Sequence, residues 1–466
     1  MEESTKISSS FDFEVLVIGG GPGGYEAAIK AAQSGKKTGI IEKEHFGGIC
    51  LNEGCIPTKV LLRSAEALKE VKRCSEFGVT HAETSEAVLD MERVQKRKSK
   101  IIRQLVSGVE SLMKANKITV IKGVGSFVDK NTVVVEGQNY TAKNIIIASG
   151  SKVKMLPIQV SERANVLTSK EILNLNYTPV DIVIIGGGVI GIEFAFFLNS
   201  IGTKVTVVEF LDRILPMVDS EITDYLVKAL TKKGIAIHTG AAVSEIKENS
   251  VVYDKGGEKF EIPASLVLMA VGRVPDTENL NAEKAGIKIT KGAIETNLKL
   301  ETNVPNIYAI GDINGKSMLA HTASMEGLIA VENICGGNRQ INYDEIPSAI
   351  YIQPEIACVG LTEEQAAKQY KNIKVGKFPM MANGKAKIAG EEEGFIKIII
   401  DKDTGKVLGA HLFCIHATDL ISEIVTDMSL NASIEDIINI VHPHPTVSEA
   451  IFEAFHAAAD RAINCL

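Results

Sequence analysis

Two cysteines separated by four residues are the feature of this sequence with the clearest chemical potential. Cys50 and Cys55 lie in Gly-Gly-Ile-Cys-Leu-Asn-Glu-Gly-Cys-Ile-Pro-Thr-Lys, residues 47–59. A structural zinc site usually takes ligands about two to four residues apart and needs a second ligand pair, which the sequence does not supply. Two inert buried thiols are a second interpretation. The third is a redox pair that forms and breaks a disulfide.

The spacing of these cysteines predicts a distorted helix. In a regular helix, residues five apart are offset by about 7.5 Å along the axis, whereas the Cα atoms of a disulfide lie roughly 4.4 to 6.8 Å apart. Gly54 can supply the unusual backbone angles. Pro57 is tolerated only in a first helical turn, so we expect Cys55 near a helix N-terminus. That position, with Lys59 one turn further on, favours a thiolate.

A histidine-rich segment is the second candidate for chemistry: His-Pro-His-Pro-Thr-Val-Ser-Glu, residues 442–449. A histidine with an ordinary pKa near ~6.5 can shuttle protons. A carboxylate on its second ring nitrogen would fix the tautomer and raise the basicity. Taken alone, two histidines between prolines indicate a loop or a weak metal site.

An internal repeat contains two glycine-rich turns. Residues 13–42 predict a strand, a glycine turn, an alanine-rich helix and a second strand, and residues 181–209 repeat this order. A shift of 167 residues carries Gly19, Gly21, Gly24, Glu26, Gly35 and Glu42 onto Gly186, Gly188, Gly191, Glu193, Gly202 and Glu209. Because all of these glycines and glutamates match at a single shift, the two segments are interpreted as two copies of one structural motif.

The context of each turn favours a dinucleotide site over a glycine-rich packing turn. Each Gly-x-Gly-x-x-Gly follows an apolar strand and has an acid 18 residues after its last glycine, close to the ~20 expected of a ribose-binding carboxylate. The glycines admit a pyrophosphate, and the helix N-terminus supplies positive potential. Glu42 suits the adenosine of FAD. Glu209 would repel the 2'-phosphate of NADP and favours NAD, although nearby Arg213 leaves NADP as the alternative.

Composition favours an acidic enzyme in a reducing compartment. The 466 residues carry a net charge of -8, which argues against the basic surface of a nucleic-acid binder. The seven cysteines are odd in number and dispersed, unlike a secreted disulfide framework. The first ten residues lack the apolar core of a signal peptide. The predicted location is the cytoplasm, with no membrane partner.

Together these motifs resemble the flavin disulfide reductases, or class I pyridine nucleotide-disulfide oxidoreductases, and most closely their dihydrolipoamide dehydrogenase branch. The resemblance covers nearly the whole chain and is most specific at the cysteine segment, where Ile49 replaces the commoner Thr or Val. It implies that Cys50 exchanges with the substrate and that Cys55 contacts the flavin. It also implies that Lys59 pairs with Glu193 near the flavin.

Further positions match the family in order along the chain. The resemblance implies that His444 is the general base and Glu449 its orienting partner, while His442 is merely adjacent. The implied FAD contacts are Gly19, Gly21, Gly24, Glu42, Lys43, Gly48, Cys50, Lys59, Gly125, Ser149, Gly150, Ser151, Asp312, Met318, Leu319, Ala320 and His321. The implied NAD contacts are Gly186, Gly188, Gly191, Glu193, Glu209, Val243 and Gly272. No metal ligand is implied. The chain departs from the family at Leu412–Ala417, where a glycine-rich or alanine-rich run is usual.

The expected fold is α/β, with two Rossmann-like domains and a C-terminal α+β dimerisation domain. The predicted divisions are an FAD-binding domain at 1–149, an NAD-binding domain at 150–274, a central segment at 275–345 that returns to the FAD domain, and an interface domain at 346–466. Predicted helices cover 55–75, 88–115, 417–430 and 448–459. Predicted strands cover 15–18, 145–148, 307–310, 396–400 and 407–412, with other short strands between 119 and 148.

The resemblance implies oxidation of protein-bound dihydrolipoamide through the disulfide and FAD, with reduction of NAD. The implied assembly is an obligate homodimer in which the base of one subunit reaches the disulfide of the other. The lipoyl group would come from a 2-oxoacid dehydrogenase, acetoin dehydrogenase or glycine cleavage system. The alternatives are another flavin disulfide reductase, similar to glutathione reductase, and a nonenzymatic NAD-responsive flavoprotein.

Overall fold

The computed structural model describes residues 11–80 and 86–464, which form two compact units. Unit 1 comprises the chain up to Pro57, Arg97–Lys154 and Arg273–Asn342; unit 2 comprises Thr58–Lys96, Met155–Gly272 and the chain from Tyr343 onward. The first ten residues, on which the signal-peptide prediction rests, lie outside the described residues. No helix in the described part of the chain is both long and apolar enough to cross a bilayer.

Unit 1 is built on a sheet ordered β3-β2-β1-β6-β5-β4, with β20 also paired to β6. Its strands are β1 (Phe13–Ile18), β2 (Thr38–Glu42), β3 (Thr119–Lys122), β4 (Ser126–Asp129), β5 (Thr132–Val135), β6 (Gln138–Ile147) and β20 (Ile307–Ala309). Smaller strands are β7 (Ser151–Val153), β17 (Arg273–Pro275), β18 (Ile289–Thr290) and β19 (Ala293–Ile294). Its helices are α1 (Pro22–Gln33), α2 (Gly48–Glu53) and α7 (Ala320–Ile334). Helices α3 (Cys55–Arg73) and α4 (Met91–Ala115) include residues of both units.

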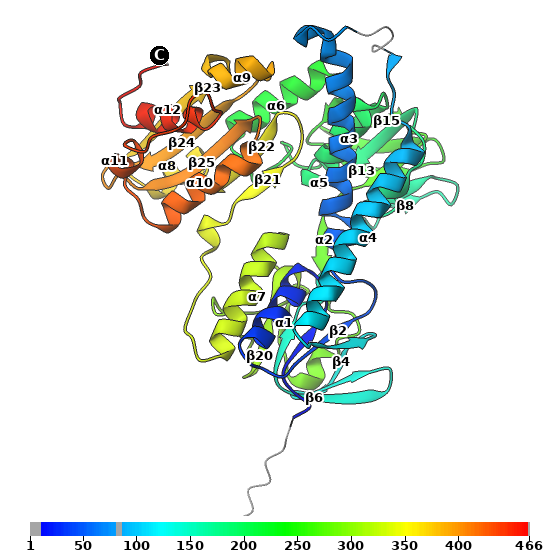
Figure 1. The fold of residues 1–466 in the computed structure, drawn as a ribbon. Helices are drawn as coiled ribbons and strands as arrows, with labels where there is room; N and C mark the ends of the chain where they lie inside the picture. The colour runs from blue at the N-terminus through cyan, green and yellow to red at the C-terminus, as the bar shows by residue number, and fades with distance from the viewer. Residues whose placement is uncertain (1–10, 81–85, 465–466) are drawn as a thin grey trace, which may run out of the picture. The chain divides into compact units, whose positions relative to one another are not determined.

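Helices α1 and α7 lie side by side (Figure 1), and glycines at their contact permit the close packing. A Cβ on Gly23 would lie 2.6 Å from the carbonyl oxygen of Ala323, and one on Gly327 would lie 2.7 Å from that of Gly23. Both distances are shorter than any real Cβ contact, so neither position accepts a side chain without movement. This packing brings residues far apart in sequence to one side of the sheet of unit 1.

Unit 2 contains a second parallel sheet, ordered β12-β11-β10-β16-β9. Its elements are β9 (Val166–Thr168), β10 (Asp181–Ile185), α5 (Val189–Ser200), β11 (Lys204–Val208), α6 (Ser220–Lys232), β12 (Ala236–His238) and β16 (Val267–Met269). A smaller sheet contains β8 (Gln159–Val160), β13 (Ala242–Ile246), β14 (Ser250–Lys255) and β15 (Glu258–Pro263). The order β3-β2-β1-β6 of unit 1 matches β12-β11-β10-β16, so the predicted repeat is a repeat of topology.

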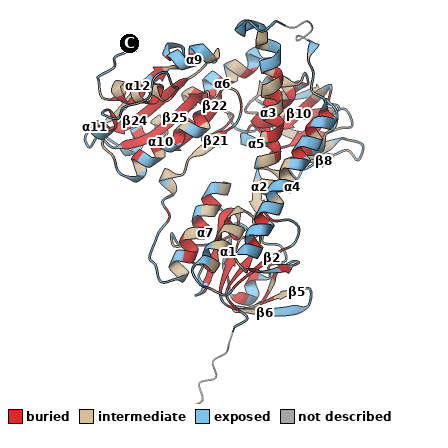
Figure 2. Cartoon of the chain, viewed as in Figure 1, coloured by how far each residue is buried: buried red, intermediate tan, exposed pale blue. Residues whose placement is uncertain are grey.

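The C-terminal part of unit 2 is an antiparallel sheet covered by helices, ordered β21-β22-β25-β24-β23. Strands β24 and β25 are buried along their whole lengths, whereas the covering helices keep exposed outer faces (Figure 2). The strands are β21 (Ser348–Ile350), β22 (Glu355–Gly360), β23 (Ile373–Pro379), β24 (Phe395–Asp401) and β25 (Val407–Cys414). The helices are α8 (Glu363–Gln369), α9 (Gly384–Ala389), α10 (Ala417–Ser429), α11 (Ile434–Ile437) and α12 (Glu449–Ala458).

These elements confirm the predicted α/β fold class. The strand predicted at 307–310 pairs with β6, which confirms its return to the first sheet. The departure at Leu412–Ala417 extends β25 to Cys414, after which His416 adopts a left-handed φ of 58° at the start of α10. The sequence patterns did not predict β13 to β15 or β21 to β23. The four-domain division stays a prediction.

A buried lysine links α6 to the antiparallel sheet of unit 2. The side chain of Lys397 is 3% exposed, and its Nζ lies 3.0 Å from Asp219 Oδ1 and 2.6 Å from Glu363 Oε2. A third carboxylate, that of Glu221, lies 3.2 Å away. Burial alone would raise the pKa of Asp219, but Lys397 and the Glu363 backbone N–H hold it below its ordinary value.

We predict that Lys397→Met lowers the free energy of unfolding by roughly 3 kcal/mol, because it leaves a buried carboxylate without its cation. Lys377→Met is the matched control: Lys377 also binds Glu221 but its side chain is 41% exposed, and it should cost less than about 1 kcal/mol. Because the folded pKa of Asp219 is lowered, its contribution to stability is lost as the pH falls through that value. The loss of stability in Lys397→Met should therefore be largest near neutral pH and should shrink as the pH falls through that pKa. Denaturant titrations over pH 3–8 measure both effects, and equal losses in the two variants would contradict the interpretation.

Candidate active site

The helix breaks between the two cysteines. Helix α2 ends at Glu53, Gly54 follows it, and α3 begins at Cys55. A Cβ on Gly54 would lie 3.0 Å from the carbonyl oxygen of Ile49, so glycine permits a close return of the backbone at this point. Cys50 is half-buried and Cys55 is exposed. The predictions of a distorted turn at Gly54 and of Cys55 at a helix N-terminus are confirmed; the pairing of the two sulfurs stays a prediction.

Lys59 and Glu193 form an ion pair within unit 2, as the resemblance implied. Lys59 Nζ lies 3.0 Å and 2.9 Å from the two carboxylate oxygens of Glu193, whose side chain is 4% exposed. The backbone N–H of Tyr351 also donates to this carboxylate at 2.9 Å, and the Lys59 ammonium lies 4.5 Å from the centroid of the Tyr351 ring. A desolvated carboxylate therefore fixes the lysine one turn after Cys55.

The three glycines of the first turn have different physical roles. Gly19 has a φ of 106°, and a Cβ there would lie 2.2 Å from the Ala148 carbonyl oxygen. A Cβ on Gly24 would lie 1.9 Å from the Gly19 carbonyl oxygen. The middle glycine, Gly21, begins α1, and a Cβ there would meet no described atom within 4 Å. Packing therefore explains the outer two glycines but not the middle one.

The second turn repeats this division. Gly186 has a φ of 113°, and a Cβ on Gly191 would lie 2.0 Å from the Gly186 carbonyl oxygen. A Cβ on Gly188 would again meet no described atom within 4 Å. The open middle glycine, repeated at the start of α5, matches a position that a pyrophosphate approaches closely. Both turns thus fit a dinucleotide.

Glu42 and Glu209 accept backbone N–H groups of their own turns. The Glu42 carboxylate accepts from Gly20 at 2.7 Å, and the Glu209 carboxylate accepts from Gly187 at 2.5 Å. A Cβ on Gly20 would lie 2.8 Å from Glu42 Oε2. Gly20 and Gly187 were not predicted as site residues, although the same shift of 167 residues relates them.

Arg213 is the residue that left NADP as the alternative nucleotide, and in the structure it forms an ion pair with another residue of unit 2. Its guanidinium lies 3.2 Å from the Glu364 carboxylate. The second oxygen of Glu209 accepts the backbone N–H of Leu211 at 2.7 Å, so the acid is held with both oxygens bonded. This arrangement favours a ribose hydroxyl over a 2'-phosphate at the Glu209 turn.

A polar chain of side chains orients Asp312 in unit 1. The Ser151 hydroxyl donates to the Asp312 carboxylate and accepts from Arg273 Nε, and Arg273 Nη2 donates to the Ser151 carbonyl oxygen at 2.7 Å. Burial lowers the pKa of Arg273, and Asp312 opposes that shift. Arg273 was missed as a site residue, although it directly follows Gly272, one of the implied NAD contacts.

A buried glutamate supports the same turn from beneath. Glu326 on α7 is fully buried and accepts the backbone N–H of Gly311 at 2.5 Å and the side-chain amide of Asn314 at 3.0 Å. This contact fixes the residues on both sides of Asp312. The sequence carries no local signal for it, because α7 contains several polar residues, including a second glutamate at Glu332, and nothing in the sequence marks Glu326 as the buried one.

The other residues predicted to contact cofactors occupy varied positions. A Cβ on Gly48 would lie 2.8 Å from the Gly21 Cα, so this glycine packs directly against the first turn. A Cβ on Gly125 would meet Ile41, Ile18 and Val133 at 3.2 to 3.3 Å, which indicates packing. Lys43, Met318, His321 and Gly272 are exposed, while Ser149, Gly150, Leu319, Ala320 and Val243 are half-buried. Their contacts with cofactors stay predictions.

His444 and Glu449 form a hydrogen-bonded pair in unit 2. His444 Nδ1 lies 2.8 Å from Glu449 Oε1, and the His444 side chain is 80% exposed. The backbone N–H of Thr446 donates to Glu449 Oε2 at 2.7 Å. Burial alone would raise the pKa of Glu449, but the Thr446 N–H and His444 lower it, so the carboxylate stays ionised. With Nδ1 bonded to a carboxylate, Nε2 is left to accept a proton.

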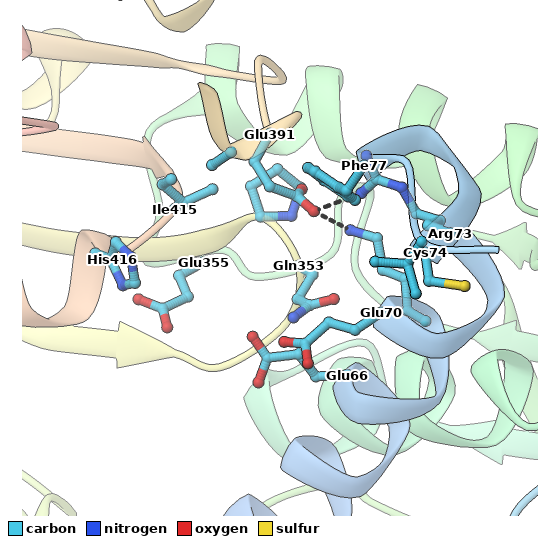
Figure 3. Close-up of a pocket in the computed structure, with 14 residues that line it drawn as sticks. Glu66, Glu70, Arg73, Cys74, Phe77, Gln353, Glu355, Glu391, Ile415 and His416 are labelled. Carbon is cyan, nitrogen blue, oxygen red and sulfur yellow. Dashed lines mark hydrogen bonds and ion pairs between the residues drawn. The ribbon is translucent and has the colours of Figure 1, made fainter. Parts of the chain in front are cut away.

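A cavity of ≈390 Å³ elsewhere in unit 2 contains none of the predicted site residues. Lys69 and Arg73 both contact the Glu391 carboxylate at 2.7 Å across it (Figure 3). Pro354, Ile415 and Phe77 add apolar surface. Both of these contacts are ion pairs formed within the cavity, and neither Cys50 nor Cys55 lines it.

Comparison with known proteins agrees with this site. Residues 13–327 match the pyridine nucleotide-disulphide oxidoreductase family, and residues 346–455 match the dimerisation domain of that family. A dihydrolipoyl dehydrogenase of Bacillus subtilis is 43% identical over 97% of this chain and 99% of its own length. The mitochondrial dihydrolipoyl dehydrogenase of Pisum sativum is 41% identical over 98% and 93%. The HOCl-induced flavoprotein disulfide reductase RclA of Escherichia coli superposes with a TM-score of 0.84 at 28% identity, over 95% and 99%.

Two glycine turns of the dinucleotide type and a cysteine pair at a helix break define an oxidoreductase that couples a disulfide to nucleotides. The chain belongs to the pyridine nucleotide-disulphide oxidoreductase family. It is therefore an enzyme, FAD and NAD(H) are the cofactors that this membership implies, and the matched dimerisation domain supports a homodimer.

We predict that Gly188→Ala and Gly191→Ala separate nucleotide binding from folding. Gly188→Ala should leave the melting temperature unchanged and weaken NADH binding about tenfold or more, because its methyl group enters only the space that a pyrophosphate would use. Gly191→Ala should lower the melting temperature, because its methyl group collides with the Gly186 carbonyl oxygen. Calorimetry and NADH titration measure both effects. Undiminished NADH binding by Gly188→Ala would show that the open glycine does not face the nucleotide.

Proposed function

We propose that this protein is a dihydrolipoyl dehydrogenase, which oxidises protein-bound dihydrolipoyl groups and reduces NAD+ to NADH. The observation that carries the proposal is the 43% identity over nearly the full length of a dihydrolipoyl dehydrogenase. The helix break between Cys50 and Cys55 supports it, because that break is what a disulfide across this spacing requires.

The proposed thiol step begins at Cys50. A dihydrolipoyl thiolate attacks the Cys50 sulfur, forming a mixed disulfide and releasing Cys55 as a thiolate. The second substrate sulfur then displaces Cys50, so the substrate leaves as a disulfide and its two electrons remain on the two cysteines. The N-terminus of the 19-residue helix α3 and the ammonium of Lys59 favour the Cys55 thiolate.

His444 accepts the proton that the substrate thiol must lose. Its Nδ1 is held by Glu449, which selects the tautomer whose Nε2 can take a proton and stabilises the imidazolium that results. Glu449 is itself held by the Thr446 backbone, so the acceptor is oriented before the substrate arrives. Exposure of His444 suits a base that acts on a group in the other subunit of the proposed homodimer.

The remaining residues hold the cofactors. Bound FAD and NAD(H) supply the hydride chemistry that carries the two electrons onward. Gly21, Glu42 and the oriented Asp312 would hold FAD, and Gly188 and Glu209 would hold NAD. The Lys59–Glu193 pair places a fixed positive charge one turn from Cys55.

The physiological partners follow from the proposed substrate. We infer a homodimer that receives lipoyl groups from a 2-oxoacid dehydrogenase, an acetoin dehydrogenase or a glycine cleavage system. The dispersed cysteines support a location in the cytoplasm. The divisions at 149, 274 and 345 are retained as proposed domain boundaries.

Anaerobic titration of the purified yellow protein with dihydrolipoamide tests this function. We expect reduction by about one equivalent per subunit and a long-wavelength thiolate-to-flavin absorption band, followed by NADH formation when NAD+ is added. Parallel assays with glutathione disulfide and NADPH test the glutathione reductase-like alternative. Faster turnover of that pair would reject the proposal, and failure of NADH to reduce the flavin would favour a nonenzymatic role.

We predict that His444→Gln reduces dihydrolipoamide oxidation by about 100-fold or more, the usual contribution of a general base. The thiol steps need this base, whereas electron transfer from NADH to an artificial acceptor does not. The second activity should therefore be largely retained. Steady-state rates of the two reactions test this prediction. If both rates fall by the same factor, His444 is not the general base.

A further inference from the structure

His442 is buried in an acidic environment that its neighbour His444 lacks. Its side chain is 7% exposed, and its Nε2 lies 2.8 Å from Glu423 Oε1 on α10. Its Nδ1 lies 3.2 Å from the carbonyl oxygen of Ile440. A carboxylate and a carbonyl oxygen can only accept hydrogen bonds, so both ring nitrogens must donate. The two contacts together favour the imidazolium form of His442.

The surroundings of His442 favour this positive charge. The hydrogen bond that His442 donates to the Glu423 carboxylate raises the pKa of His442. Asp427, also on α10, is buried, and its Oδ2 has no hydrogen-bond partner among the described residues. Burial, with Glu423 adding to it, raises the pKa of Asp427 to about 6, and His442 opposes that shift. His442 thus interacts electrostatically with two acids of α10, Glu423 and Asp427. It also lowers the pKa of a third acid, Glu449 on α12.

The loop that carries His444 has few inward contacts. Residues 441–446 lie outside helix and strand, and Val441 is 92% exposed. Pro443, His444 and Pro445 are also exposed. The side chain of His442 is the inward contact at one end of this segment, and buried Val447 follows at the other. The His442 ring also lies 5.6 Å from the Phe452 ring on α12, so His442 contacts both α10 and α12.

We propose that His442 is a positioning residue for the general base, joining the His444 loop to α10 and thereby holding His444 against Glu449. This inference rests on the proposed function for its kinetic consequence but not for its structural one. Without the two donors of His442, the exposed segment would lose its link to α10. His444 would then populate both tautomers, and only one of them presents Nε2 as the acceptor.

The test compares His442→Phe with His456→Gln in the flavin-loaded homodimer. Phenylalanine keeps the ring beside Phe452 but removes both donors. His456 is the matched control, because its ring lies 4.2 Å from the same Phe452 ring. Glu423→Gln is a second variant that keeps His442 and weakens only its acceptor, so the proposal stays testable if His442→Phe does not fold.

Two measurements decide the proposal. The rate of flavin reduction by dihydrolipoamide, measured by stopped flow, should fall about tenfold in His442→Phe and about threefold in Glu423→Gln. Losses of this size are typical when a residue that orients a reactive group is removed. Reduction by NADH should stay within about twofold, because it uses no base. Ring ¹⁵N shifts, assigned to His444 by their loss in His444→Gln, should show one tautomer in the wild type and in His456→Gln but a mixture in His442→Phe.

Each contrary outcome has a distinct meaning. An unchanged tautomer with a dithiol rate near that of the wild type would overturn the proposal. Parallel losses of both half-reactions would also overturn it, because they indicate general damage to the fold. If the wild type itself is not reduced by dihydrolipoamide, the proposed function fails, and the ¹⁵N shifts still decide whether His442 positions His444.

Discussion

The nucleotide units of this protein depend on the close approach of one backbone segment to another. In each copy of the repeat, the carbonyl oxygen of the first glycine occupies the space that a side chain on the third would fill, at 1.9 Å for Gly24 and 2.0 Å for Gly191. This close contact between backbone segments lets the helix begin directly after the strand. No side chain or backbone atom of the described residues covers the middle glycine. The acid that ends the next strand then accepts a backbone N–H of the turn. A side chain at either outer glycine would separate the helix from the sheet and remove the cradle.

Helix ends and short chains of hydrogen-bonded side chains position the residues that we propose to react or to bind cofactors. The break at Gly54 starts a new helix at Cys55, and Lys59 on that helix is held by a buried carboxylate. Asp312 is held by Ser151 and, from beneath, by Glu326 through the turn. The proposed general base, His444, is oriented in the same way. The backbone of Thr446 binds Glu449, and Glu449 binds His444. At each point a second residue orients the reactive one, which limits the motion that catalysis would otherwise have to overcome.

The charged groups in the C-terminal part of unit 2 are arranged for different purposes. Lys397 lies among Asp219, Glu221 and Glu363, where a buried cation joins elements distant in sequence. His442 lies among Glu423 and Asp427, beside the exposed loop that carries the base. Both clusters place one cation among several acids, but only the second contains groups that titrate near neutral pH. The loop that carries His444 is therefore connected to a cluster in which burial raises the pKa of Asp427 to about 6.

The sequence by itself determined the repeat, the fold class, the helix break at Gly54 and the pairs Lys59–Glu193 and His444–Glu449. These features are readable because each rests on a local rule, such as glycine at close approaches or proline in a first turn, or on a motif quoted by resemblance. Only the tertiary structure decided the roles of Arg273, Glu326, Lys397 and His442. Their partners lie on other elements of their units, and one acid in a helix reads like any other until packing buries it beside a donor. The physical reason is that local backbone preferences are encoded within a few residues, whereas desolvation and hydrogen-bond pairing depend on which distant segments the fold brings together.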